Sequence, residues 1–498
     1  MLYLPADQML QRAKTALTDG KLGFAEQAAR SVVNAAPTLV DGWVTLGRVL
    51  TSTVRLDEAE DAFRTADEVN SDHLDTSLAR AQLQWRRGND AEVIRLANIV
   101  LRKIPDQLEA TILSGMAHRR LGQLDDAIRI LKPISKQASG AAAMAWTMLD
   151  MKSPSSAIDV LTPHTVAIAT QPPSVKAPLF HVLGQAHEAT GNFEAAFRAY
   201  TVSKTATPVN FAEDQFRAGL KLLPEVFTPE LLQNGPRSTV QTSRPVFIAA
   251  MPRSGTTLLD RIIAAHPLAA GAGETRALRR QISEWSSTDP NAAWPRVTRN
   301  FLTADLNRIA TRYLTETTQF GPGAERISDK HLQNWTHVGL IAMAFPDARV
   351  IHLQRDPMDI GISCFERLEG PAIPWSTNLK SIGLAIKATE SLMAYWKEHS
   401  RIKILTVQYE DLVRHQERET RRVIEFLGLP WDDACLAHHD RAGAREPRAD
   451  GVAAPVAPPP TLGSEQASRP VSDKSIGRAA RFGRLLDPLR EALASETI

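Results

Sequence analysis

The sequence contains only two cysteines, Cys364 and Cys435, among its 498 residues. Two cysteines cannot form a disulfide framework, and they cannot build a zinc site without many other ligands, so this usage suits a reducing compartment. No uncharged run of about 18 apolar residues occurs, so we expect no membrane-spanning helix. The N-terminal residues contain no basic stretch followed by an apolar core, so we expect no signal peptide and a cytoplasmic location.

An excess of charge of one sign is also lacking. The 58 basic residues nearly cancel the 56 acidic residues, so the overall charge gives no reason to expect a nucleic-acid partner. A phosphate site must therefore depend on the local placement of basic residues. The composition, with 43% hydrophobic and 23% charged residues, is typical of a soluble globular protein, and 498 residues are too many for one ordinary core. We expect two or more domains.

Four glycines in the N-terminal part recur at spacings close to multiples of 34 residues, namely Gly20, Gly88, Gly122 and Gly191. Other small residues and prolines follow the same period: Ala25, Ala59, Val93, Ala127 and Ala196, then Pro37, Pro105 and Pro208, and also Gly47, Gly115 and Gly184. Small residues allow the two helices of a hairpin to approach closely, glycine permits the turn between them, and proline ends the second helix. The pattern therefore predicts repeated helix pairs.

This pattern resembles the tetratricopeptide repeat over roughly residues 6–209, with about six units, and the match degrades around residues 140–175. We predict a tetratricopeptide-like helical solenoid for residues 1–209, with a generic helical bundle as the alternative. A solenoid buries its core by stacking its units and leaves a concave groove. We expect this groove to bind a protein or peptide partner or a substrate, and a role in packing or homodimerisation stays open.

Near residue 240 the composition changes, and we expect a linker over residues 210–244. An apolar run at residues 246–250 then predicts a buried parallel strand, and residues 256–265 predict a helix with one apolar face. We predict an α/β domain, with a parallel sheet flanked by helices, over residues 245–498.

The segment Pro252–Thr257 connects this strand to this helix. Successive amides in such a turn point at one place beside a helix N-terminus, which makes an anion site. A nucleoside-triphosphate P-loop would need the spacing G-x-x-x-x-G-K-[ST] with its lysine, and that lysine is missing. Arg253 supplies a positive charge instead, from the other side of Gly255.

The residues PRSGTTLL in this segment resemble the 5′-phosphosulfate loop of sulfotransferases that use 3′-phosphoadenosine 5′-phosphosulfate (PAPS). About a hundred residues further on, a predicted strand at residues 349–353 precedes Arg355, with Ser363 eight residues later, which resembles the 3′-phosphate segment of this family. The resemblance implies a P-loop-like α/β fold, PAPS as the sulfuryl donor and adenosine 3′,5′-bisphosphate as the product. It also implies donor-binding roles for Arg253, Ser254, Gly255, Thr256, Thr257, Arg355 and Ser363.

Further segments resemble protein-tyrosine sulfotransferases, so that the resemblance covers about residues 244–485. Residues 273–276 are similar to the G-E-E-T-R segment, residues 328–330 to the catalytic-lysine segment, residues 407–412 to V-x-Y-E-x-L, and SIGRAARF to S-V-G-R-W. These similarities add Arg367, Tyr409 and Arg478 to the implied donor-binding residues. Two positions in the tail depart from the family pattern, because Ala479 replaces a tryptophan and Gly463 replaces a donor-contacting serine. Residues 446–460 are rich in proline, and we expect them to form a mobile excursion or lid.

The family resemblance implies in-line transfer of a sulfuryl group to an acceptor hydroxyl, catalysed mainly by positioning and charge stabilisation. It implies that Glu274 is the general base, that Lys330 stabilises the transferring group and that Arg253 assists. His331 is a rival base, because many cytosolic small-molecule sulfotransferases use a histidine, whereas we expect His266 to be structural. No metal is implied, since side chains can supply the cations and no ligand cluster is visible.

Two other functions stay open at this point. A P-loop kinase of a small molecule is one, although the missing lysine and the segment after residue 354 argue against it. A scaffold that binds partners through its repeats, with a degenerate catalytic domain, is the other. The identity of the acceptor also stays open between peptide tyrosine, a saccharide hydroxyl and a small metabolite. The resemblance slightly favours a peptide.

Overall fold

The computed structural model describes residues 5–167, 171–206, 209–288, 293–367, 373–439 and 469–495, together with residue 467. The chain divides into two compact units, Met1–Ala199 and Tyr200–Ile498, which we call the helical-repeat unit and the α/β unit. Each unit is described by itself below. Among the described helices, none combines the length and the apolar character that a bilayer span requires.

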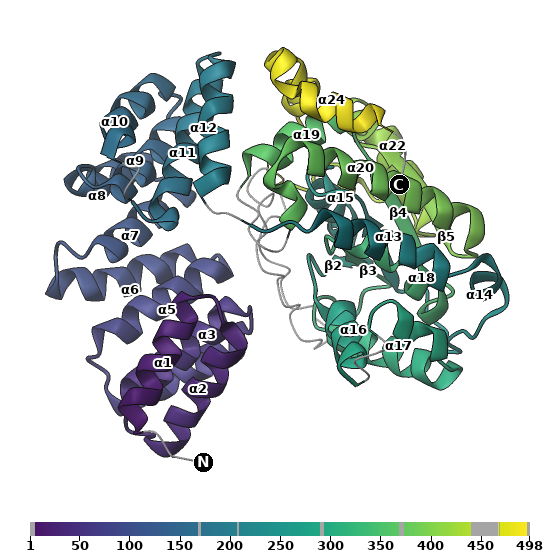
Figure 1. Cartoon of the computed structure of the whole chain (residues 1–498), viewed down its shortest axis with the longest axis horizontal. Helices are drawn as coiled ribbons and strands as arrows, with labels where there is room; N and C mark the ends of the chain where they lie inside the picture. Colours follow the sequence, from purple (N-terminus) through teal and green to yellow (C-terminus); the bar gives the residue numbers. More distant parts are fainter. Residues whose placement is uncertain are drawn as a thin grey trace. The chain divides into compact units, whose positions relative to one another are not determined.

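Between residues 5 and 206, the described residues form six helix pairs that follow one another in chain order (Figure 1). The pairs are α1 (Ala6–Thr18) with α2 (Leu22–Ala35), α3 (Val40–Ser52) with α4 (Leu56–Val69), α5 (Leu74–Arg87) with α6 (Asp90–Lys103), α7 (Leu108–Arg120) with α8 (Leu124–Leu131), α9 (Ala138–Asp150) with α10 (Pro154–Ala167), and α11 (Pro173–Ala189) with α12 (Phe193–Ala206). The first helices of neighbouring pairs also pack on one another along the unit. The predicted tetratricopeptide-like solenoid is confirmed.

Small residues lie where the helices of a pair approach most closely. Ala25, Ala59 and Ala127 are fully buried. A Cβ atom added to Gly47 would lie 2.3 Å from the ring of Phe63, so only glycine fits at this crossing. The packing role that the sequence predicts for these small residues is therefore present.

The turn inside each helix pair contains one residue with a positive φ. Glycine occupies four of these turns, with φ of 73° at Gly20, 77° at Gly88, 76° at Gly122 and 81° at Gly191. Val54 and Lys152 occupy the other two, both with φ of 61°. The backbone pattern therefore continues through two helix pairs whose turns lack the glycine in the sequence.

Polar side chains also join the first helices of neighbouring repeats. Lys14 Nζ lies 2.6 Å from Asp41 Oδ2, and Arg48 Nη2 lies 2.6 Å from Asp75 Oδ1. In both pairs the two residues are 27 positions apart in the sequence. The side chains are partly exposed, so each pair contributes at most about 1 kcal/mol to stability. We infer that these two ion pairs mainly fix how consecutive repeats align.

The described strands of the α/β unit form one parallel sheet in the order β2-β3-β1-β4-β5. The strands are β1 (Pro245–Ala249), β2 (Ala269–Gly271), β3 (Arg326–Asp329), β4 (Arg349–Gln354) and β5 (Lys403–Gln408). Phe247 and Ala249 face one apolar core, and Val246 and Ile248 face the other. Because both faces are covered, the central strand β1 is apolar and buried along its whole length, as is usual for a parallel sheet. The predicted α/β fold is confirmed.

Helices cover both faces of the sheet (Figure 1). One face packs against α13 (Glu213–Val226), α14 (Pro229–Asn234), α16 (Ala277–Thr288), α17 (Thr303–Thr318), α18 (Asn334–Ala344) and α20 (Leu379–His399), and the other against α15 (Thr256–Ala265), α21 (Tyr409–Arg414) and α22 (Gln416–Phe426). The unit also contains α19 (Pro357–Glu366), the 3₁₀ helix η8 (Arg478–Leu486) and α24 (Asp487–Ala494), along with four shorter 3₁₀ helices among the described residues. The strand at 246–250, the helix at 256–265 and the strand at 349–353 are thus found within one residue of the prediction.

The segment that we expect to be a linker contains two of these helices. Leu220, Leu223 and Val226 of α13 are buried in the core of the α/β unit, as is Leu232 of α14. Their spacing of three to four residues is that of an amphipathic helix. The polar, proline-bearing residues 233–245 that suggested a linker begin only where α14 ends.

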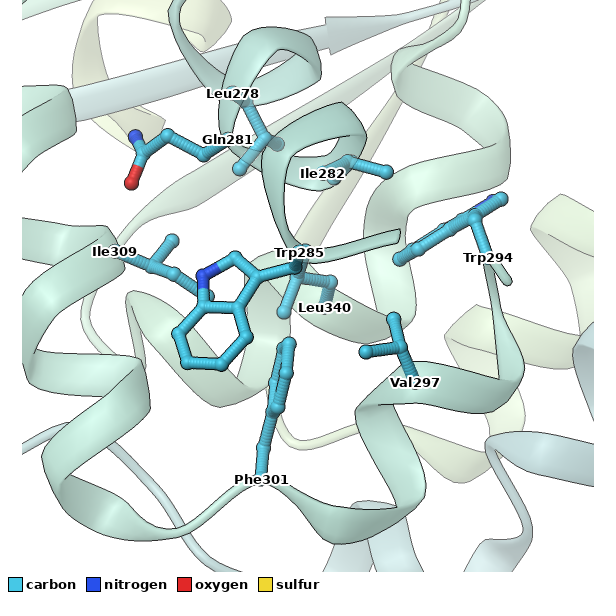
Figure 2. A pocket seen from close by; sticks show the side chains of 9 residues that line it. All are labelled: Leu278, Gln281, Ile282, Trp285, Trp294, Val297, Phe301, Ile309 and Leu340. Atoms are coloured by element: carbon cyan, nitrogen blue, oxygen red, sulfur yellow. The ribbon is translucent and has the colours of Figure 1, made fainter. Parts of the chain in front are cut away.

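A cluster of aromatic side chains closes the core beside α16 (Figure 2). The rings of Trp285 and Phe301 have their centroids 4.9 Å apart, and Trp294 lies on the same side of the core. The gap between them is lined by Leu278, Gln281, Ile282, Trp285, Trp294, Val297, Phe301, Ile309 and Leu340. It is too narrow for a water molecule, so this region belongs to the packed core.

The repeat turns make a testable prediction about stability. A β-branched residue with positive φ costs roughly 1–2 kcal/mol, and the side chain of Val54 is exposed, so removing it sacrifices little packing. We expect Val54→Gly to raise the free energy of unfolding by about 1 kcal/mol. Gly88→Val, at the equivalent turn of the next repeat, should lower it by a similar amount. Urea unfolding followed by circular dichroism measures both, and a destabilised Val54→Gly would contradict the strain argument.

Candidate active site

The carboxyl end of every strand in the described sheet is followed by a residue that the sequence marks as functional. These residues are Arg253 after β1, Glu274 after β2, Lys330 after β3, Arg355 after β4 and Tyr409 after β5. In an open α/β sheet, ligands bind outside the carboxyl ends of the strands, where the strand order reverses. The order β2-β3-β1-β4-β5 places that reversal beside β1.

The loop between β1 and α15 has an unusual backbone. Arg253 has φ of 70°, which is strained for a residue other than glycine, and such strain is concentrated at functional sites. Gly255 has φ of 96° and is the N-cap of α15. A Cβ atom on Gly255 would lie 2.4 Å from the ring of Tyr409, so the loop passes directly against that ring. Ser254 is fully buried, and its hydroxyl oxygen has no hydrogen-bond partner among the described residues.

Arginine side chains join this loop to the segment after β4. Arg355 Nη1 donates a hydrogen bond to the carbonyl oxygen of Arg253 at 2.7 Å, and its guanidinium carbon lies 4.6 Å from the centre of the Tyr409 ring. Arg253 Nε in turn donates to Ser363 Oγ of α19 at 3.1 Å. The structure thus brings together Arg253, Arg355, Ser363 and Tyr409, which come from the segments after β1, β4 and β5.

Two further predicted residues, Arg367 and Arg478, meet at a carboxylate. Glu366, at the end of α19, is only 6% exposed. Its carboxylate forms a salt bridge with Arg478, and its Oε1 lies 3.8 Å from Arg367 Nε. The sequence does not predict a role for Glu366, because an acidic residue near an expected phosphate site is usually a solvent-exposed charge.

The predicted catalytic pair is in contact. Lys330 Nζ donates to Glu274 Oε1 at 2.9 Å, and the backbone amide of Lys330 donates to the carbonyl oxygen of Gly273 at 2.9 Å. The Lys330 side chain is 2% exposed, whereas that of Glu274 is 32% exposed. The ammonium group is therefore enclosed, and the carboxylate reaches the surface.

Two buried carboxyl groups lie behind Lys330, and sequence reasoning missed both. Asp260 accepts a hydrogen bond from Ser328 Oγ at 2.5 Å. Burial raises the pKa of Asp260, and the nearby positive charge of Lys330 opposes this increase. Asp329 accepts from Tyr313 at 3.0 Å, and burial raises the pKa of Asp329 to about 6 against the hydrogen bonds that it accepts. Nothing in the sequence distinguishes Asp260 from an ordinary acidic residue on the polar side of a helix with one apolar face.

The two histidines that the sequence offers differ in their surroundings. His331 Nδ1 accepts a hydrogen bond from the amide of Gln333 at 3.2 Å. Burial lowers the pKa of His331 to about 4, and the positive charges of Arg279, Arg276 and Lys330 add to this effect. At neutral pH its imidazole is uncharged and weakly basic. His266 contacts the carbonyl oxygen of Pro430 through Nε2 at 2.7 Å and the amide of Leu268 through Nδ1 at 3.1 Å, as a structural residue would.

The remaining predicted positions are Thr256 and Thr257, Gly463 and Ala479. Thr256 and Thr257 form the first turn of α15. Gly463 and the proline-rich residues 446–460 lie outside the described residues. The amide of Ala479 donates to Asp359 Oδ1 at 2.7 Å. Within the described part of the chain, no group of three His, Cys, Asp or Glu side chains is arranged to hold a metal ion.

Comparison with known proteins identifies the α/β unit. Residues 245–433 match the model of the sulfotransferase family, so the C-terminal part of the chain is a sulfotransferase-family domain. A protein of Aquifex aeolicus described as uncharacterized is 24% identical over 451 residues, which cover 88% of this chain and 57% of that protein. Protein-tyrosine sulfotransferase A of Caenorhabditis elegans is 27% identical over 219 residues, covering 41% of this chain and 54% of that protein.

The similarity to the protein-tyrosine sulfotransferases is thus distant, and the chain spans a little over half the length of these two relatives. Among solved structures, the sulfotransferase domain of the olefin synthase of Synechococcus PCC 7002 is 21% identical. The overlap covers 53% of this chain and 99% of that one, with a TM-score of 0.31.

The environment of His331 makes a prediction that nuclear magnetic resonance can check. Because burial and three positive charges disfavour its protonation, we expect the ring signals of His331 to stay those of neutral imidazole between pH 8 and about 5. Arg279→Ala should raise the pKa of His331, because a positive charge is removed. The signals are assigned by their loss in His331→Gln. A titration midpoint at or above the ordinary value of 6.5 would refute this description.

Proposed function

We propose that the α/β unit transfers a sulfuryl group from PAPS to an acceptor hydroxyl and releases adenosine 3′,5′-bisphosphate. The observation that carries the proposal is the direct linkage of the two donor motifs. Arg253 of the first motif bonds Ser363 of the second, and Arg355 of the second bonds the carbonyl of Arg253. Both motifs lie inside the matched family region, residues 245–433.

The loop after β1 suits the 5′-phosphosulfate end of the donor. The amides in the first turn of a helix have no carbonyl partner within the helix, and the helix dipole favours an anion there. The buried Ser254 hydroxyl lacks a partner among the described residues, and leaving such a group unsatisfied costs about 1–3 kcal/mol. A phosphate oxygen would accept from it. Thr256 and Thr257 place two more hydroxyl groups in the same turn.

The segment after β4 suits the 3′-phosphate. A guanidinium group binds phosphate oxygens with two parallel hydrogen bonds, and a serine hydroxyl adds a neutral donor. Arg355 and Ser363 provide these groups, and Arg367 and Arg478 bring two more positive charges to the end of α19. Tyr409 lies against both Gly255 and Arg355, where its ring would contact the nucleotide.

We assign the proton transfer to Glu274. PAPS supplies an activated sulfuryl group, whose bond to the bridging oxygen breaks as the acceptor oxygen attacks. The acceptor approaches the exposed part of the Glu274 carboxylate, and Glu274 takes the proton of the acceptor hydroxyl. The enclosed Lys330 ammonium stabilises the negative charge that develops on the bridging oxygen. Arg253 adds a second positive charge from the donor loop. His331 has no advantage in basicity over a carboxylate, because burial lowers the pKa of its imidazole to about 4. Glu274 is preferred because its carboxylate contacts Lys330 and reaches the surface.

For the acceptor we propose a tyrosine in a peptide or protein, recruited with the help of the helical-repeat unit. The distant similarity to protein-tyrosine sulfotransferases supports this choice, and the exposed part of Glu274 is accessible to a large acceptor. A screen of labelled-sulfate transfer from PAPS to tyrosyl peptides, glycans and phenols distinguishes this acceptor from the others. The screen also distinguishes an enzyme from a scaffold without activity.

Donor recognition is testable by calorimetry. We expect adenosine 3′,5′-bisphosphate to bind at least about ten times more tightly than ADP or AMP, because Arg355 and Ser363 bind a phosphate that the other two nucleotides lack. Tenfold corresponds to about 1.4 kcal/mol, which is modest for a charge-assisted contact. Equal affinities for the three nucleotides would exclude this donor.

The roles of Glu274 and Lys330 differ in their response to pH. We expect Glu274→Gln to retain donor affinity and to lose about 10²–10⁴-fold in turnover, the usual contribution of a general base. With an acidic phenol as acceptor, raising the pH should restore part of this loss, because the acceptor then arrives deprotonated. Lys330→Ala should lose a comparable factor without such recovery, since it removes charge stabilisation.

His331→Ala is the matched control for this experiment, and its turnover should change far less. A Glu274→Gln enzyme with near-normal turnover, together with an inactive His331→Ala enzyme, would assign the base to the histidine.

A further inference from the structure

The tail of the chain is tied to α19 by a buried carboxylate that the proposed chemistry does not use. Asp359 is 1% exposed. Its Oδ2 accepts a hydrogen bond from the amide of Gly477 at 2.7 Å, and its Oδ1 accepts one from the amide of Ala479 at 2.7 Å. One carboxylate therefore holds the backbone on both sides of Arg478.

The local backbone explains why the tail offers two amides to one anion. Gly477 has φ of 71° and ψ of 14°, the left-handed conformation, and η8 begins at the next residue. A left-handed residue followed by a helical one turns nearby amides toward the same side and forms an anion-binding nest. Two charge-assisted hydrogen bonds offset the cost of burying the charge of Asp359.

Asp359 is not needed to cap its own helix. The side chain of Asp356 accepts from the amides of Met358 and Asp359 and caps α19. Among the described residues, the donors that bond the Asp359 carboxylate are both amides of the tail. The contact therefore fixes the position of the tail and adds little to the capping of α19.

The tail follows the face of α19 that carries the proposed 3′-phosphate serine. Asp359, Ser363 and Glu366 are spaced four and three residues apart, which places them on one face of the helix. Asp359 binds the backbone around Arg478, and Glu366 binds its guanidinium group. The Arg478 side chain is 16% exposed, so it is held along this face.

We propose that Asp359 is a positioning residue for the 3′-phosphate of the donor, and that it acts by fixing Arg478 through the amides of Gly477 and Ala479. This inference rests on the proposed function. An arginine loses up to about 2 kcal/mol of side-chain entropy when it is immobilised, so holding its backbone in advance leaves more of the binding energy for the phosphate. We call the contact of Asp359 with the amides of Gly477 and Ala479 the clamp. The family pattern has tryptophan at position 479, but the clamp uses only the backbone amide there and so does not depend on a tryptophan ring.

The test compares the affinities for adenosine 3′,5′-bisphosphate and for AMP by calorimetry, because their ratio isolates the 3′-phosphate. Asp359→Asn and Arg478→Ala should each lower this ratio about fivefold, the loss of a single charge-assisted contact. The double variant should lose no more than Arg478→Ala alone, because Asp359 acts through Arg478. A purely structural role would weaken both nucleotides equally and leave the ratio unchanged.

A second pair of variants covers the case in which Asp359→Asn does not fold. A Cβ atom at Gly477 or at Gly483 would meet no atom within 4 Å, and both glycines have positive φ, 71° and 52°. Each alanine substitution therefore acts through backbone strain alone. Gly477→Ala should lower the nucleotide ratio because it disturbs the clamp, whereas Gly483→Ala should lower stability and leave the ratio unchanged.

The outcomes separate this inference from the proposed function. If the wild-type protein does not prefer adenosine 3′,5′-bisphosphate to AMP, the proposed donor is wrong and the inference falls with it. If the wild-type protein prefers it and Asp359→Asn, Arg478→Ala and Gly477→Ala keep the wild-type ratio, the clamp has no part in donor binding.

Discussion

The guanidinium group of Arg355 holds the site together. It donates to the carbonyl oxygen of Arg253 in the loop after β1 and, at 2.6 Å, to the carbonyl oxygen of Ser475 in the tail, and it lies over the ring of Tyr409 at the end of β5. One cation therefore connects three segments that the sheet alone would leave independent. Arginine suits this position, because its planar fork binds several acceptors at once and always stays charged.

Carboxylates form the other half of this framework. Glu366 and Asp359 hold the tail along α19, and Asp260 lies buried behind Lys330. In each case a carboxyl group of the protein lies close to a cation or to backbone amides. In the proposed reaction, the positive charges are thereby in place before the phosphate groups of the donor bind, and such prior arrangement is a main source of catalysis in the transfer of charged groups. The arrangement is also costly to disturb, because removing one partner leaves a buried charge without compensation.

Local signals in the sequence predict much of this fold, and long-range contacts account for what they miss. The loop after β1 and the helix at 256–265 follow from a motif of neighbouring residues, and the repeat period follows from glycines and alanines. Val54 and Lys152 were missed because a left-handed turn is recognised through glycine, although other residues adopt it under strain. Asp359 was missed because its partners lie 118 and 120 residues away, and spacing along the chain gives no indication of such a contact.

A crystal structure of the complex with adenosine 3′,5′-bisphosphate tests the central claim most directly, namely that the loop after β1 and the segment after β4 form one donor site. The account predicts that the 5′-phosphate lies on the amides of residues 254–257. It also predicts that the 3′-phosphate lies within about 3 Å of the donor atoms of Arg355 or Ser363. A nucleotide bound elsewhere on the α/β unit, or bound with its two phosphates exchanged, would contradict the account.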